Sequence, residues 1–491
     1  MKKTIVLALT LVTLLAAVQA QKTNLPAGLS SIKSIDLKND LYALADAHFK
    51  GRSAGTLDEL KASTYIGELY NKIGLVPLGD DGTYFQFFNL MRNVLDEKST
   101  IQINGREMKM WKEVSVQQMA NYEGSDIIQY AGNAADIDTN KIDVKGKIVA
   151  FEANSKGINL DVSLPTWRYS RSIMTKYAMP LIRKGAAAII IVADEAGEKS
   201  FEDANANFQR GTYDIEGGPN ERVQFKVPVI WVHAASKSMI ANNARVSMKL
   251  NIQHYAYPSV NIIGKIEGTD PTLKNEYVLY SGHQDAHGIR NLQEGDSIYY
   301  GADDNASVDV AMFAIARTFK AHPSKRSILF VIHGAEERGL LGSRYYTAHP
   351  TVNLDNLVTV LNGDMIGRNH LDSAAILGAQ APHKNSSDLV NIALQANQKG
   401  PQFKLDTTYD KVTHVEGWYF RSDHLPYARL GIPALMYTSL LHPDYHTPKD
   451  NAQNINYPKL KKMTDWMYLT GWEVANRKER PAKEPSFKLE R

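Results

Sequence analysis

The sequence predicts an α/β protein with a mostly parallel sheet sandwiched by helices and an inserted small β-rich block. Two patterns lead to this expectation. From Pro258 onward, short apolar runs alternate with segments of helical periodicity, which is typical of a parallel sheet whose crossover connections are helices. Between residues 110 and 255, short strands follow one another with only one or two helices, which indicates a separate module. The length of 491 residues is sufficient for both.

Helical segments are expected near the start of the chain, between residues 36 and 75. Apolar residues recur at helical spacing in LKNDLYALADAHF and in ASTYIGELYNKIGL, and the glycine-containing FKGRSAGT separates them as a loop. The inserted block opens with WKEVSVQQMAN and contains expected strands in VKGKIVAFEA, GAAAIIIVAD and QFKVPVIWV. Its acidic residues are spread over turns, so we expect the chemistry to lie elsewhere.

The second half of the chain is expected to supply the main sheet. Expected strands, in chain order, are VNIIGKIEG, EYVLYSG, RSILFVIHG, LVTVLNGDM and IPALMYTS. Expected helices are residues 305–320, GLLGSRYYTAH, DLVNIALQANQ and residues 456–476. The charged, proline-broken end is expected to be a flexible tail. These patterns divide the chain into residues 1–20, 21–109, 110–255, 256–476 and 477–491.

The N-terminus has the pattern of a secretory signal peptide. Two lysines precede an apolar run over residues 5–18, and the segment VQA offers small side chains for cleavage near Ala20. The mature chain would then begin near Gln21. The alternative, a membrane anchor, is disfavoured because the run is shorter than the roughly 20 residues that a span needs. A secreted or periplasmic location is therefore expected.

Charge and cysteine content exclude several classes of function. The net charge is +3, with Lys and Arg scattered along the chain, which argues against binding to nucleic acid or to an anionic membrane surface. The chain has no cysteine. Thiol catalysis and thiolate metal sites are therefore excluded, and a core of this size is sufficient without disulfides.

Histidines and carboxylates follow several of the apolar runs. Because an open α/β sheet gathers residues from the carboxyl ends of its strands into one crevice, we expect these side chains to lie close together. They stand in VLYSGHQD, GADDNAS, HGAEERGLLGS, VTVLNGDMIG and PALMYTSLLHPDYHT.

This combination suits a pair of zinc ions about 3.5–4 Å apart that hold a water molecule between them. One carboxylate bridges the ions, each ion takes about two further nitrogen or oxygen ligands, and an unligated carboxylate accepts the proton of the water. The expected ligands are His283, Asp304, Glu337, Asp364 and His446, and the expected base is Glu336. Asp285 is expected to accept the other N–H of the His283 imidazole and fix its tautomer.

Together these motifs resemble the di-zinc exopeptidases, which include secreted bacterial aminopeptidases and glutamate carboxypeptidases. SGHQD, GADDNAS, GAEERGLLGS, NGDMIGR, RSDHLPYARLGIP and YHTPKDN carry the resemblance, which extends from about residue 41 to 472. FKGRSAGT and YIGELYNKIGLVPLGDDGTYFQ are similar to the family's N-terminal segment. The resemblance implies the zinc exopeptidase fold, with residues 110–255 as a protease-associated domain that interrupts the catalytic domain.

The resemblance also implies a role for each ligand. His283 and Asp364 would bind one zinc, Glu337 and His446 the other, and Asp304 would bridge the two. Two zinc ions per chain follow.

Further roles concern the residues around these ligands. Asn305 would follow the bridging aspartate through a cis peptide, and Glu336 would act as general base and later as acid. Either Tyr445 or Tyr419 would stabilise the oxyanion, and Tyr445 is preferred. Val308 departs from the family pattern, which has glycine at this position at the start of a helix, so the packing behind the metal site is expected to differ.

Several neighbouring residues have competing interpretations. Asp303 is the other member of its doublet, but the family motif favours Asp304 as the ligand. His287 is interpreted as a polar loop or substrate-contact residue rather than as a ligand. Residues expected to support the site without binding zinc are His333, Asp423 and His424.

The resulting functional hypothesis is a zinc-dependent aminopeptidase that acts on peptides. A carboxypeptidase or a dipeptidase on the same scaffold is the nearest alternative, followed by a glutaminyl cyclase and a non-catalytic relative. A basic cluster facing the pocket would mark a carboxylate-binding enzyme, whereas free acidic groups would mark an amine-binding one. The inserted block is expected to restrict access to the site.

Overall fold

The computed structural model describes residues 25–158, 168–217, 226–241, 243–293, 295–414, 416–485 and 487–489. The expected signal peptide, residues 1–20, lies outside the described residues. Within the described part, no helix has the length and apolar character needed to cross a bilayer.

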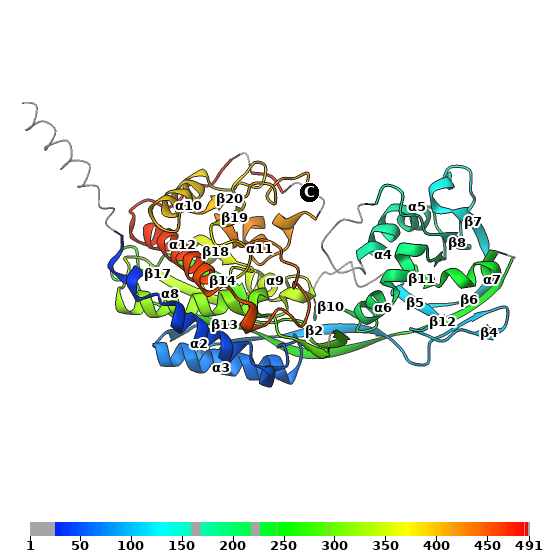
Figure 1. The fold of residues 1–491 in the computed structure, drawn as a ribbon, viewed down its shortest axis with the longest axis horizontal. Coiled ribbons are helices and arrows are strands. Elements are labelled where there is room, and N and C mark those ends of the chain that lie inside the picture. Colours follow the sequence, from blue (N-terminus) through cyan, green and yellow to red (C-terminus); the bar gives the residue numbers. More distant parts are fainter. Residues whose placement is uncertain are drawn as a thin grey trace, which may run out of the picture.

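A ten-stranded sheet forms the main domain (Figure 1). Its strands lie in the order β10-β2-β13-β17-β14-β18-β21-β19-β20, and β1 pairs with β13 outside this path. The strands are β1 (Val76–Pro77), β2 (Phe85–Leu95), β10 (Thr212–Ile215), β13 (Ile252–Ile266), β14 (Tyr277–His283), β17 (Ser327–His333), β18 (Leu357–Gly363), β19 (Ser373–Leu377), β20 (Lys404–Leu405) and β21 (Ala434–Thr438).

The centre of this sheet is parallel. Strands β17, β14, β18 and β21 run in the same direction. Antiparallel strands flank them, with β13, β2 and β10 on one side and β19 on the other. The mainly parallel sheet expected from the sequence is confirmed at its centre, and the carboxyl ends of the central strands share one edge.

Helices cover both faces of the sheet. Successive strand residues point to opposite faces, and the central strands are apolar at consecutive positions, so both faces need to be buried. On β14, Val278 and Tyr280 belong to the core cluster that contains residues of α2, α3, α8, α10 and α12, whereas Leu279 belongs to the cluster that contains residues of α9 and α11. These helices are α2 (Ser34–Leu44), α3 (Leu57–Ile73), α8 (Ser307–Ala321), α9 (Leu341–Ala348), α10 (Ser387–Lys399), α11 (His424–Arg429) and α12 (Tyr457–Asn476).

The inserted block contains two further sheets, one ordered β5-β11-β9-β8-β7 and the other β4-β3-β12-β6. Their strands are β3 (Thr100–Ile103), β4 (Arg106–Glu107), β5 (Val114–Gln118), β6 (Tyr122–Ile127), β7 (Gln129–Asn133), β8 (Ile148–Glu152), β9 (Ala188–Val192), β11 (Val229–Val232) and β12 (Arg245–Leu250). Its helices are α4 (Arg168–Ile173), α5 (Met179–Arg183), α6 (Glu195–Phe208) and α7 (Lys237–Ala241).

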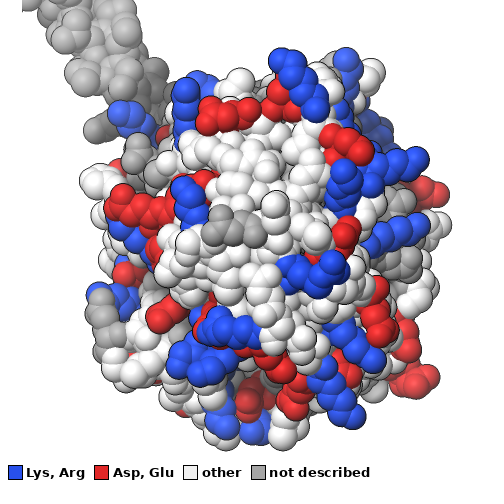
Figure 2. Space-filling view, turned by 90° about the vertical axis from the view of Figure 1, so that its right-hand side faces the viewer, with Lys and Arg blue, Asp and Glu red and all other residues white. Residues whose placement is uncertain are grey.

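The boundaries of this block differ from those expected at residues 110 and 255. It begins earlier, because β3 and β4 belong to the sheet that contains β12. One of its internal segments, β10, instead pairs with β2 of the main sheet. Figure 1 shows the block at the end of the long ribbon formed by β2 and β13. On its outer face, acidic and basic side chains are interspersed around an uncharged area (Figure 2).

The C-terminal segment differs from the flexible tail expected. The Arg480 Nε donates to Glu276 at 3.0 Å, and the Ala482 N–H donates to Asp388 at 2.9 Å. These contacts hold the segment against the main domain although its sequence is charged and contains prolines.

Candidate metal centre

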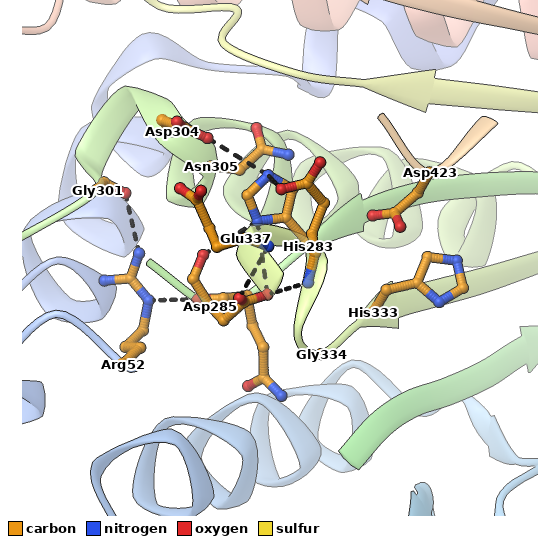
Figure 3. A network of polar contacts seen from close by, with 12 residues as sticks. Arg52, His283, Asp285, Gly301, Asp304, Asn305, His333, Gly334, Glu337 and Asp423 are labelled. Carbon is orange, nitrogen blue, oxygen red and sulfur yellow. Dashed lines mark hydrogen bonds and ion pairs between the residues drawn. The ribbon is translucent and has the colours of Figure 1, made fainter. Parts of the chain in front are cut away.

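Loops at the carboxyl edge of the central strands bring the expected ligands together. His283 is the last residue of β14, and Asp364 follows β18 directly. Asp304 lies in the turn η8 (Ala302–Ala306) that precedes α8, and Glu337 lies in the 3₁₀ turn η9 (Glu336–Arg338) after β17. His446 comes from the loop after β21. Figure 3 shows His283, Asp304 and Glu337 converging from three different elements.

Asp304 lies between two histidines, as a bridging carboxylate requires. Its Oδ1 is 3.3 Å from His283 Nε2, and its Oδ2 is 3.0 Å from His446 Nε2. His446 Nε2 is also 3.1 Å from Glu337 Oε1. The two oxygens of one carboxylate therefore face two separate groups of ligands.

The first group combines His283, Glu336 and Asp364, whose ligand atoms lie within 4.8 Å of one another. His283 Nε2 is 3.8 Å from Glu336 Oε2 and 3.9 Å from Asp364 Oδ2. The expected base therefore lies as near to this imidazole as the expected ligand does.

The second group contains a histidine that the sequence analysis set aside. His287 joins Glu337 and His446, with its Nε2 3.4 Å from Glu337 Oε2 and its ring centroid 4.0 Å from that of His446. Its position four residues past His283, in a glycine-containing loop, gave no sign of this convergence.

The chemistry of these groups fits a pair of zinc ions. His283 Nε2 and Glu337 Oε1 are buried and make no hydrogen bond within the part of the chain that the structure describes. Imidazole nitrogens and carboxylate oxygens are the ligands that zinc takes when cysteine is absent. A buried polar atom without a partner is costly, and a bound metal ion removes that cost.

Mutual electrostatics also favour cations here. Burial by itself lowers the pKa of His283, but the Glu336, Asp304 and Asp364 carboxylates raise it well above its usual value. Burial raises the pKa of Asp364 to about 8, and the neighbouring Asp304 carboxylate contributes. Concentrated negative charge thus retains protons, and a bound dication would take their place.

Asp285 has a different contact from the one expected. Its carboxylate accepts the main-chain N–H groups of Glu336 at 2.9 Å and Glu337 at 3.2 Å. The carboxylate Oδ1 is 3.7 Å from His283 Nδ1, and the main-chain carbonyl of Asp285 lies closer to that nitrogen, at 3.0 Å. The hydrogen bond of His283 Nδ1 is therefore made with the main-chain carbonyl, while the Asp285 carboxylate lies only within ion-pair distance of the imidazole. Asp285 instead fixes the loop that carries both glutamates (Figure 3).

Two buried charges that the sequence analysis did not single out hold the neighbouring loops. Asp450 accepts the main-chain N–H groups of Asp303 at 2.8 Å and Asp304 at 3.0 Å. Arg52 donates to the carbonyls of Gln284 at 2.7 Å and Gly301 at 2.9 Å (Figure 3). Asp450 lies in the motif YHTPKDN and Arg52 in FKGRSAGT, and both motifs carry the family resemblance. Those motifs were the sequence features that could have indicated the two residues.

The start of α8 is fixed against two strands. The peptide bond between Asp304 and Asn305 is cis, as the resemblance implied. Val308 lies against two strand glycines: a Cβ at Gly282 would be 2.6 Å from Val308 Cγ1, and one at Gly363 would be 2.8 Å from it. The side chain that replaces the family's glycine therefore occupies space that these glycines leave free.

The two candidate tyrosines have different surroundings. Tyr445 stacks on His446 with ring centroids 3.6 Å apart, so it lies beside the metal centre. Tyr419 instead stacks on His383 at 4.1 Å.

The supporting residues make the following contacts. His333 Nε2 lies 3.1 Å from the hydroxyl of Tyr427 and is buried, in keeping with a structural role (Figure 3). Asp303 accepts the N–H of Gly367 at 2.5 Å and therefore faces away from the bridging position. The carboxylate of Asp423 accepts the Ser343 hydroxyl at 2.5 Å. His424 is also buried.

A match to a known protein family covers the part of the chain that follows the inserted block. Residues 261–470 match the model of peptidase family M28. Aminopeptidase YwaD of Bacillus subtilis is 27% identical over 233 residues, which cover 43% of this chain and 49% of the relative. A probable leucine aminopeptidase 2 of Aspergillus oryzae is 28% identical over 127 residues, covering 26% of this chain and 23% of the relative. The chain thus spans half the length of these relatives or less.

Solved structures resemble the chain over almost its full length. An aminopeptidase from Aneurinibacillus sp. strain AM-1 superposes with a TM-score of 0.60 at 18% identity, covering 93% of this chain and 97% of that one. A zinc aminopeptidase from Bacillus subtilis gives a TM-score of 0.59 at 20% identity, covering 93% and 99%. These similarities establish the overall fold.

Proposed function

We propose that this chain is a zinc-dependent aminopeptidase that releases N-terminal residues from peptides, since residues 261–470 match the model of peptidase family M28. The observation that carries the proposal is the position of Asp304 between His283 and His446, with Glu336 beside the same site. The names of the similar proteins, which include several aminopeptidases, support the choice of the N-terminal end.

The residues that would hold a metal pair are His283 and Asp364 on one side, Glu337 and His446 on the other, and Asp304 between them. A zinc pair at this position supplies Lewis-acid activation of a water molecule and of the peptide carbonyl.

Glu336 is suited to move the proton. Burial raises the pKa of its carboxyl well above the usual value, and the nearby Glu337 carboxylate adds to this effect. A base with a raised pKa can accept a proton from water and then return it to the leaving amine. Asp285 positions Glu336 by accepting its main-chain N–H, so the side chain starts from a fixed backbone.

Tyr445 is suited to donate a hydrogen bond to the oxyanion. Burial raises the pKa of its phenol well above the usual value, so the hydroxyl remains protonated in the working pH range. The ring is held against His446, a candidate metal ligand, so the residue lies beside the site where the oxyanion would form.

An end-blocking experiment tests the proposal. One peptide sequence is prepared with both ends free, with an acetylated N-terminus and with an amidated C-terminus, and the products are identified by mass spectrometry. The free and amidated peptides should lose their first residue, and the acetylated peptide should be resistant. Release of the last residue from the acetylated peptide would favour a carboxypeptidase instead. A chelator control and restoration by zinc establish that the activity depends on metal.

We also propose that the protein is secreted or periplasmic, since two lysines precede the apolar run over residues 5–18 and VQA follows it. Expression of the full chain followed by intact-mass analysis of the exported protein tests this. A mature form beginning near Gln21 is expected, and retention of the complete N-terminus in the cytoplasm would refute it.

A further inference from the structure

Three arginines from separate parts of the chain gather beside the second ligand group. Arg338 directly follows Glu337 in η9, and Arg290 lies on β15 (Gly288–Gln293), shortly after His287. Arg210 comes from the inserted block, between α6 and β10. Contacts of α6 with β15 and of β10 with η9 bring the three together. We call them the arginine cluster.

Neutral groups hold the cluster in place. The Arg338 guanidinium lies 4.9 Å from the ring centroid of Tyr213 and donates to Ser53 Oγ at 2.9 Å. The Arg290 guanidinium lies 5.2 Å from the ring centroid of Tyr299. The guanidinium of Arg210 donates to the side-chain and main-chain oxygens of a single asparagine, Asn207. These contacts orient the side chains without neutralising them.

The cluster lacks the carboxylate partners that other arginines of this chain have. Arg317, Arg326 and Arg368 each form an ion pair with an aspartate or a glutamate. Within the described residues, no such ion pair involves any member of the cluster. One nitrogen of each member is buried without a hydrogen bond: Arg210 Nη1, Arg290 Nε and Arg338 Nε.

Two carboxylates, those of Asp203 and Glu337, act on the cluster. Burial lowers the pKa of both the Arg210 and the Arg290 guanidinium, and repulsion within the cluster lowers each further. Glu337 opposes the shift at both arginines, and Asp203 opposes it more strongly at Arg290. Glu337 would be bound to metal in the active protein, so its charge would not be free to compensate the arginines. Asp203 would then be the one carboxylate named here that still acts on the cluster, and the excess of positive charge favours an external anion.

We infer that Arg210, Arg290 and Arg338 form a binding subsite for a carboxylate group of the peptide substrate. The planar guanidinium group matches a carboxylate with two parallel hydrogen bonds, and three such groups at one place favour an anion strongly. This inference rests on the proposed function and narrows it to short peptides that bring a carboxylate close to the metal centre. A basic cluster is also the expected mark of a carboxypeptidase, and release of the last residue in the end-blocking experiment would assign the cluster to that enzyme instead. The carboxylate is either the C-terminus of a short peptide or an acidic side chain next to the scissile bond.

Matched substrates test this with the unmodified protein. Leu-Gly-Gly is compared with its C-terminal amide, and Leu-Glu-Gly-amide with Leu-Gln-Gly-amide. We expect kcat/KM to be higher by about 10- to 100-fold for the carboxylate member of at least one pair, since a charged hydrogen bond contributes on that scale. Preference in the first pair identifies the C-terminus as the source, and preference in the second identifies the side chain.

Variants locate the effect. Arg290→Gln and Arg210→Gln should each lower kcat/KM for the preferred carboxylate substrate by about tenfold or more, mainly by raising KM. For the neutral counterpart, kcat/KM should change by no more than about twofold. Arg344→Gln on α9 removes an equal charge from a half-buried arginine outside the cluster and serves as the matched control. Arg290→Lys should restore part of the loss, because the charge returns without the planar fork.

Failure of this inference differs from failure of the proposed function. Equal efficiency on both members of both pairs, together with release of N-terminal leucine, would overturn the carboxylate subsite and leave the aminopeptidase intact. No hydrolysis of any of the four peptides by the zinc-loaded protein would overturn the proposed function. The unmodified protein gives this answer even if a variant does not fold.

Discussion

Replacing Gly282 by alanine should destabilise the protein, and replacing Val308 by alanine in the same chain should relieve most of that destabilisation. The Cβ added at residue 282 would lie 2.6 Å from Val308 Cγ1, well inside the distance of an ordinary carbon contact. With the γ carbons removed, the nearest neighbour becomes Val308 Cβ at 3.2 Å. Small local adjustments of the backbone can accommodate that separation.

The expected energies follow from the buried volumes. Gly282→Ala overpacks a fully buried site and should cost about 1–3 kcal/mol of unfolding free energy. Val308→Ala deletes two buried methyl groups and should cost about 1–3 kcal/mol. If the sites were independent, the double variant would lose about 2–6 kcal/mol. Because the new methyl group fills space that the valine vacates, we expect it to lose about 1–2 kcal/mol, a coupling of about −1 to −4 kcal/mol.

Urea unfolding followed by far-UV circular dichroism measures these values. The measurement is made with excess chelator, so that metal binding does not contribute to stability. The control pairs Gly282→Ala with Val192→Ala, which lies in the separate core of the inserted block, and should be additive within about 0.5 kcal/mol. Additivity of Gly282→Ala with Val308→Ala would refute the claim that these residues compete for one volume.

Four further predictions concern the metal centre, a buried acid and the inserted block. Elemental analysis should find about two zinc ions per active chain, and full activity without a transition metal would exclude the proposed chemistry. Glu336→Gln should retain zinc while kcat falls by about 10²–10⁴, whereas Glu337→Gln should lose zinc along with activity; the opposite result would exchange their roles. Burial raises the pKa of Glu59 to about 8, above its value in the unfolded chain. The stabilisation from this group is therefore present at low pH and is lost as the pH rises toward 8. Glu59→Gln should flatten the fall of the unfolding free energy between about pH 5 and 8, and an unchanged slope would contradict this. If the inserted block restricts access, as we expect, a dipeptide should be hydrolysed with higher kcat/KM than a decapeptide or a folded protein with an accessible N-terminus, and equal efficiency on all three would exclude that role.

The sequence predicted those parts of the fold that depend on local pattern. Apolar runs and helical periodicity located the central strands, because each strand is buried on both faces and reads as a continuous apolar segment. The order of polar residues after these strands then predicted the convergence of His283, Asp304, Glu337 and His446. Both results follow from properties that lie within a few residues of one another in the chain.

Contacts between distant segments were not predictable in the same way. The approach of His287 to Glu337 depends on how a glycine-containing loop folds back, and no periodicity encodes that path. The carboxylate of Asp285 meets main-chain N–H groups, which any residue supplies, so the sequence carries no sign of the partner. Arg210 belongs to a block that looked independent, and its place beside Arg338 required β10 to join the main sheet.

The pairing of β2 with β13 limits how the inserted block can move. These strands pair from Phe85 with Ile262 to Leu95 with Ile252, and β10 returns from the block to pair with β2. A swinging lid would need to break this ladder, which is costly because every exposed N–H and C=O would lose its partner. We therefore expect the block to move little relative to the main sheet, so that turnover would not wait for a domain to open.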